Sequence, residues 1–108
     1  MDIAEPRIGC VIPARNEAVH IGATMQGIVH QTEAVEPIVV VDDSSTDGTG
    51  QVAAGFGATV VLRTGERWPT RTQNICAAIN QGLDSMPSDL RYVMILGAHN
   101  GLPTRYCE

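Results

Sequence analysis

The sequence predicts an α/β fold built on a parallel β-sheet. Four short apolar runs are continuous rather than alternating, as in strands that are covered on both faces. Segments with helical spacing of apolar residues separate these runs, so the expected order is β-α-β-α-β-α-β, which favours a parallel sheet with right-handed crossovers. With 108 residues, 44% hydrophobic and 18% charged, the chain fits one globular domain over residues 1–108.

The first helix is expected between Asn16 and His30, with the Asn16 side chain capping its first turn. A short second helix is expected from Thr49 to Ala54, before two glycines that suit a helix end. The third begins near Thr70 and ends before Pro87. The strands are expected at the apolar runs Ile8 to Ile12, Ile38 to Val41, Thr59 to Leu62 and Tyr92 to Leu96.

Composition excludes several classes of function. The net charge is -5, and seven arginines without any lysine form no basic stripe, so nucleic acid is not an expected partner. Cys10, Cys76 and Cys107 have no CxxC spacing, which argues against a disulfide framework or a zinc site. No apolar run approaches the ~18 residues of a membrane span, and the first residues lack the pattern of a secretory signal. We expect a cytoplasmic location.

Each predicted strand is followed by a polar segment: "PARNE", "DDSSTDG", "RTGERWPTR" and "GAHNG". In a parallel sheet the carboxyl ends of all strands lie at one edge, where open α/β sheets bind ligands. The four segments therefore predict a single polar crevice. Because an ionised carboxylate is purely an acceptor, Asp43 can accept hydrogen bonds from the imide N–H of uracil or from ribose hydroxyls. Asp42 and Asp47 are interpreted as turn and cap residues.

"VIPARNEA", followed by "VVVDDSSTDGT", resembles the opening of family 2 glycosyltransferases of the GT-A fold, which use nucleotide-diphosphate sugars as donors. The resemblance implies a Rossmann-like parallel sheet of about four strands in the order 3-2-1-4, with three crossover helices. It also implies a UDP- or GDP-sugar as the ligand and no organic cofactor. By this resemblance the residues that contact the donor nucleotide are Pro13, Ala14, Arg15, Glu17, Asp43, Arg67 and Arg71.

The sequence departs from that family after the fourth strand. There the family carries an Asp-x-Asp motif that holds a divalent metal, whereas this chain has Gly97 and His99 at those positions. His99 is the candidate ligand for Mn²⁺ or Mg²⁺, to which Asn100 could add an oxygen. The alternative is that His99 is a polar residue that binds no metal.

The family also continues into a half that binds the acceptor and supplies a catalytic base, whereas this sequence ends at Glu108. The resemblance thus implies a truncated donor-binding domain, with its catalytic residue unknown. The alternative is an inactive module that binds nucleotide or assembles with another chain. The apolar strand Tyr92 to Leu96 lies at the sheet edge in the implied order, so we expect a second copy or a partner chain to cover it.

Overall fold

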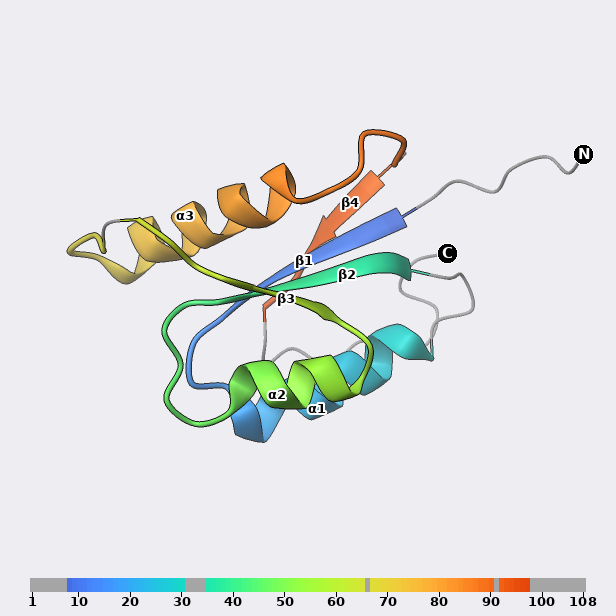
Figure 1. The fold of residues 1–108 in the computed structure, drawn as a ribbon, viewed down its shortest axis with the longest axis horizontal. Helices are drawn as coiled ribbons and strands as arrows, with labels where there is room; N and C mark the ends of the chain where they lie inside the picture. The colour runs from blue at the N-terminus through green and yellow to red at the C-terminus, as the bar shows by residue number, and fades with distance from the viewer. Residues whose placement is uncertain (1–7, 31–34, 66, 91, 98–108) are drawn as a thin grey trace, which may run out of the picture.

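The computed structural model describes residues 8–30, 35–65, 67–90 and 92–97. They form one parallel sheet in the order β3-β2-β1-β4, with three helices between the strands (Figure 1). The predicted fold class, strand order and number of helices are confirmed. The elements are β1 (Ile8–Ala14), α1 (Ala18–Val29), β2 (Val35–Asp42), α2 (Thr49–Gly55), β3 (Thr59–Leu62), α3 (Arg71–Asp84) and β4 (Tyr92–Ile95).

The helices cover both faces of the sheet, as the continuous apolar strands predict. Figure 1 shows α1 and α2 on one face and α3 on the other. Alternate side chains of β1 divide between the two layers, because Cys10 and Ile12 pack in the cluster that contains Ile21 and Met25 of α1, whereas Val11 packs with Ala78. The core therefore consists of two apolar layers, one on each face of the sheet.

Helix α3 packs closely on the sheet at Gly82. A Cβ atom at this position would lie 2.5 Å from Cγ1 of Val11 and 3.0 Å from Cγ2 of Val41. A contact of 2.5 Å essentially never occurs between real atoms, so a side chain at this position would force Val11 or α3 to shift. Gly82 thereby allows α3 to pack closely on β1 and β2.

Some boundaries differ from the sequence prediction. Helix α1 begins at Ala18, with Glu17 rather than Asn16 at the capping position. Asn16 instead adopts a left-handed backbone conformation with φ of 53° and accepts a hydrogen bond from the N–H of Thr46 with its side chain. Strand β2 starts three residues earlier than expected, because Val35 pairs with Ile8. None of the described helices is long and apolar enough to cross a membrane.

Candidate functional site

A cavity of about 560 Å³ opens at the carboxyl edge of the sheet. Its volume lies within the ~300–1,000 Å³ that small-molecule sites usually have. Segments that follow all four strands contribute to its lining, so the predicted single crevice is present. All seven candidate donor-contacting residues line it: Pro13, Ala14, Arg15, Glu17, Asp43, Arg67 and Arg71. The rest of the lining is mainly apolar and includes Trp68, Ile75, Ala78, Ile79, Ile95 and Leu96.

Asp43 is placed at this edge by the backbone of the sheet. Its N–H donates to the carbonyl of Ala14 at 2.8 Å, so the pairing of β1 and β2 continues one residue beyond the end of β2. Its carboxylate is 9% exposed and forms ion pairs through Oδ1 with Nη1 of Arg67 at 2.6 Å and with Nη1 of Arg63 at 3.2 Å. The second oxygen, Oδ2, accepts no hydrogen bond from any described residue, and it remains an acceptor for a ligand.

Opposing effects act on the pKa of Asp43. Burial alone would raise this pKa, because it disfavours the charged form. The hydrogen bonds from Arg67 and Arg63, together with their positive charges, outweigh burial and hold the pKa below its usual value of 3.8. Asp43 is therefore a carboxylate at neutral pH and acts as an acceptor rather than as a general acid.

Arg63 is a site residue that the sequence analysis missed. Its side chain is 3% exposed, and Nη1 donates both to Asp43 and, at 3.1 Å, to Oδ1 of Asn74. One signal was present in the sequence. Arg63 directly follows β3 just as Asp43 directly follows β2, and residues at equivalent ends of neighbouring parallel strands lie side by side. Arg63 does not line the cavity, and its buried guanidinium forms an ion pair with Asp43 from behind the lining.

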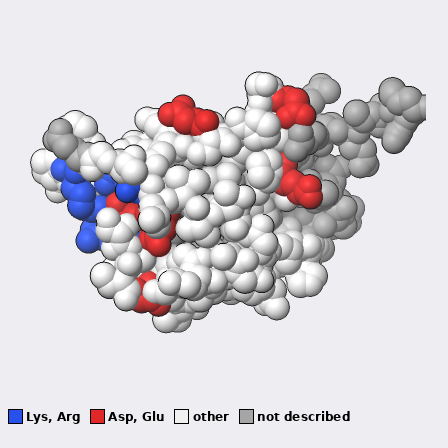
Figure 2. Space-filling view, in the orientation of Figure 1, with Lys and Arg blue, Asp and Glu red and all other residues white. Residues whose placement is uncertain are grey.

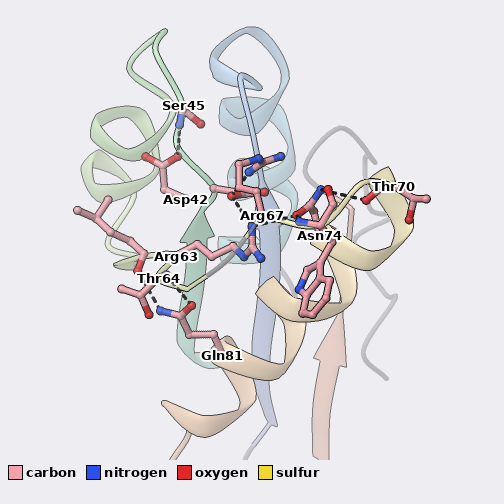
Figure 3. Close-up of polar contacts among 11 residues, drawn as sticks. Asp42, Ser45, Arg63, Thr64, Arg67, Thr70, Asn74 and Gln81 are labelled. Carbon is pink, nitrogen blue, oxygen red and sulfur yellow. Dashed lines mark hydrogen bonds and ion pairs between the residues drawn. The ribbon is translucent and has the colours of Figure 1, made fainter.

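Asn74 on α3 holds the segment between β3 and α3 in place (Figure 3). Its Oδ1 also accepts from the N–H of Trp68 at 2.9 Å, and its Nδ2 donates to the carbonyls of Trp68 and Thr70, each at 2.9 Å. Asn74 is 7% exposed, so these bonds replace water that the amide has lost. Thr70 caps α3 in a reciprocal capping box with Gln73. The backbone that carries Arg67 and Trp68 is fixed as a result.

Two further loops are joined to each other at the other side of the site. The N–H of Asn16 donates to Oγ of Ser45 at 2.9 Å, while its Oδ1 accepts from the N–H of Thr46 at 2.8 Å. Asp47 bridges the helix starts, because it accepts from the N–H of Ala18 on α1 and from both the N–H and hydroxyl of Thr49 on α2. The pKa of Asp47 is lowered, chiefly by the hydrogen bond from Thr49. Asp47 has the cap-like position expected from the sequence.

Asp42 also serves the backbone, because its Oδ1 accepts from the N–H of Ser45 at 3.0 Å. Its neighbour Asp43 alone of the two acids lines the cavity. The two adjacent carboxylates therefore have different roles: Asp42 stabilises the turn, and Asp43 lines the cavity.

The described residues at this edge do not fit a divalent metal. Glu17 and Asp43 are the only described acids in the lining, and Oδ1 of Asp43 is bound by two guanidinium groups. Gly97 brings no side chain. Within the described ranges, no group of three His, Cys, Asp or Glu side chains could hold a metal ion. His99, the candidate ligand from the sequence, lies outside the described residues.

A parallel sheet with a basic and apolar cavity at its carboxyl edge is the arrangement of α/β proteins that bind ligands beyond their strand ends. The sequence narrows this class further. The family model described as Glycosyl transferase family 2 matches residues 10–108, and the chain belongs to this family. Over 51 residues, 47% of this chain, it is 47% identical to the 4,4'-diaponeurosporenoate glycosyltransferase of Staphylococcus aureus.

Solved structures with the same fold include two relatives above 25% identity. Glucosyl-3-phosphoglycerate synthase from Mycobacterium tuberculosis, in complex with Mn²⁺, UDP and glucosyl-3-phosphoglycerate, is 26% identical with a TM-score of 0.68 over 86% of this chain. Mannosyl-3-phosphoglycerate synthase from Rubrobacter xylanophilus is 28% identical with a TM-score of 0.71 over 87% of this chain. Staphylococcus aureus TarS in complex with UDP, at 18% identity and a TM-score of 0.74 over 92% of this chain, supports the fold alone.

All of these proteins are much longer than the matched region. The chain spans 13% of the length of the Staphylococcus aureus relative. It spans 33%, 31% and 29% of the three solved chains, in the order given above.

Proposed function

We propose that this chain is the donor-binding part of a glycosyltransferase and binds a nucleotide-diphosphate sugar in the cavity at the carboxyl edge of the sheet. The observation that carries the proposal is the pairing at Asp43. A buried carboxylate is held there by two arginines through one oxygen, while the other oxygen is left for a ligand. Carboxylates in this state accept hydrogen bonds from ribose hydroxyls or from the imide of uracil.

The other lining residues have roles that follow from their chemistry. Pro13, Ala14, Arg15 and Glu17 form the wall at the carboxyl end of β1 and would lie against the nucleoside. Arg67 and Arg71 are exposed at the opposite side and would contact the diphosphate, since guanidinium groups bind phosphate oxygens in bidentate fashion. UDP in the complex of glucosyl-3-phosphoglycerate synthase favours a uridine nucleotide, and a guanosine nucleotide is the alternative base.

In the proposed transfer, the bond between the anomeric carbon of the sugar and the diphosphate breaks, and a new bond to an acceptor hydroxyl forms. The nucleotide leaves as the diphosphate, and a base takes the hydroxyl proton. The described cavity offers no obvious base, because Asp43 is engaged by arginines and Glu17 lies on the nucleoside wall. We therefore assign binding of the donor to residues 1–108 as one domain. Acceptor binding and the base are assigned to a region that the longer relatives contain.

The relatives in complex with Mn²⁺ or Mg²⁺ and UDP provide a precedent for a divalent cation in such a site. In this chain the cation would depend on His99. A cytoplasmic location and a second copy or partner chain over β4 remain predictions of the same kind. Tyr92 and Ile95 of β4 are 58% and 48% exposed. A chain that stays monomeric at tens of micromolar in analytical ultracentrifugation would contradict self-association.

Titration with uridine diphosphate and guanosine diphosphate, followed by calorimetry, tests the proposed function. The matched variant is Asp43→Asn. Its amide oxygen is expected to face the two arginines, which puts an NH₂ donor in place of the acceptor Oδ2. We expect about tenfold weaker binding, the usual effect of losing a hydrogen bond to a charged group. No binding of either nucleotide at millimolar concentration would refute the donor site, and unchanged binding by folded Asp43→Asn would refute the role of Asp43.

Donor hydrolysis separates the two functions that the sequence left open. A glycosyltransferase domain that retains chemistry should release sugar slowly from its donor in the absence of acceptor. An inactive module should bind the same donor and leave it intact.

A further inference from the structure

Within the part of this acidic chain that the structure describes, positive charge gathers at one place. Every arginine in the described ranges lies at or beside the cavity: Arg15, Arg63, Arg67 and Arg71. In Figure 2 the basic atoms visible on this face cluster at one end, next to a few acidic atoms. Among the described lining residues, three arginines against the carboxylates of Glu17 and Asp43 leave a net charge of +1, whereas the whole chain carries -5. The cavity is thus matched to an anion.

The four arginines do not contribute equally. Arg63 is enclosed, with its side chain 3% exposed and bonded to Asp43 and Asn74, so it supports the acid from behind. Arg67 is 39% exposed and donates only one of its hydrogen bonds to a described residue, through Nη1. The remaining N–H groups of its guanidinium can face a ligand. Arg71, at the first position of α3, is also exposed and lines the cavity.

A divalent cation at the same place would meet unfavourable surroundings. The acid that is most deeply set in the lining already has two positive partners, and a third cation nearby would be repelled by both. Gly97, which lies just beyond β4 in the cavity lining, brings no carboxylate that could bind a cation. The described lining therefore has more arginines than acids, which favours direct binding of an anion by the protein.

We propose that this cavity compensates the charge of a nucleotide diphosphate with Arg67 and Arg71 and binds it without a divalent cation. The proposal rests on the proposed function, because it concerns the same ligand site. A nucleotide-sugar diphosphate carries one negative charge on each phosphate, and Arg67 and Arg71 offer one positive charge for each. Arginine forks can bind such oxygens in pairs. The buried Arg63–Asp43 pair then serves to fix Arg67, which Asp43 holds at 2.6 Å.

Uridine and uridine diphosphate, each titrated in excess EDTA and again in excess Mn²⁺, test this proposal. The single tryptophan, Trp68, lines the cavity, so its fluorescence provides a second readout besides calorimetry. We expect the dissociation constant of uridine diphosphate to differ by less than about threefold between the two conditions. Because charge-assisted hydrogen bonds are lost, Arg67→Ala and Arg71→Ala should each raise the dissociation constant of uridine diphosphate about tenfold in EDTA. The dissociation constant of uridine should change less than about twofold.

Controls separate local contacts from net charge and from misfolding. Gln26→Glu on the exposed side of α1 changes the net charge by the same amount as Arg67→Ala, and it should leave binding unchanged. No described residue bonds to the Arg71 side chain, so Arg71→Ala keeps the test valid if Arg67→Ala unfolds.

The outcomes are distinct. Binding of uridine diphosphate only with Mn²⁺ would overturn this proposal and leave the proposed function standing. Equal weakening by Gln26→Glu, or full binding by both arginine variants, would also overturn it. No binding of uridine or uridine diphosphate under either condition would overturn the proposed function as well.

Discussion

Removal of the Asp43 carboxylate should destabilise the fold through Arg63 more than through Arg67. In Asp43→Ala the guanidinium of Arg63, 3% exposed, keeps Asn74 as a hydrogen-bond partner and loses its ion pair with Asp43. Breaking a buried ion pair of this kind costs about 2–3 kcal/mol. Arg67 is 39% exposed, so water replaces much of its ion pair, which contributes less than about 1 kcal/mol. We expect the free energy of unfolding to fall by about 3 kcal/mol in total.

Double-mutant cycles measured by urea unfolding at pH 7 resolve the two contributions. In these cycles Arg63→Met and Arg67→Met, which keep the side-chain length and remove the charge, are each combined with Asp43→Ala. Far-UV circular dichroism reports the unfolding, and the cycles isolate each pairwise energy. We expect a coupling of about 2 kcal/mol between Asp43 and Arg63 and below about 1 kcal/mol between Asp43 and Arg67. Equal couplings, or a loss below about 1 kcal/mol in Asp43→Ala, would refute the reasoning from burial.

Three further predictions concern stability. Asn74→Ala should lower the free energy of unfolding by about 2–4 kcal/mol, because several hydrogen bonds of a buried amide are lost. If urea unfolding shows no change in this free energy beyond experimental error, the role of Asn74 is contradicted. Gly82→Ala should destabilise the fold by about 1–2 kcal/mol through the clash with Val11. The matched variant Gly55→Ala, whose Cβ would meet nothing within 4 Å, should be neutral or slightly stabilising. Thermal melts that rank the two variants in the opposite order would show that α3 can shift. The contribution of Asp43 to the free energy of unfolding should be present above the unfolded pKa of 3.8 and should be lost as the pH falls through the lowered folded pKa, because only the carboxylate pairs with arginine. In Asp43→Asn, measurements of unfolding against pH should no longer show this part of the acid dependence.

The fold could be predicted because its signals are local. Continuous apolar runs such as Ile38 to Val41 mark buried parallel strands, and the Thr70 cap marks the start of α3. The position of Asp43 in the cavity also followed from local information, because any residue directly after a parallel strand lies at the carboxyl edge.

The supporting residues depend on distances between elements, and the sequence does not contain these directly. Asn74 reads as an ordinary polar position on a helix, yet it bonds to a loop that precedes the helix. Asn16 has the residue type of a helix cap, but the neighbouring loop offers it the N–H of Thr46, and this tertiary bond wins over the local one. Arg63 belongs to the same group, since its partner is 20 residues away in the sequence.

The two loops joined through Asn16 and Asp47 have a consequence for the thermodynamics of binding. Both loops are held to each other and to the starts of α1 and α2 before any ligand arrives. A ligand that meets a wall in its final shape does not have to order the backbone, a step that otherwise costs about 1–2 kcal/mol for each residue fixed. Affinity at the nucleoside end should therefore reflect contacts almost alone, and the entropy lost on binding should come from the exposed arginine side chains at the other end.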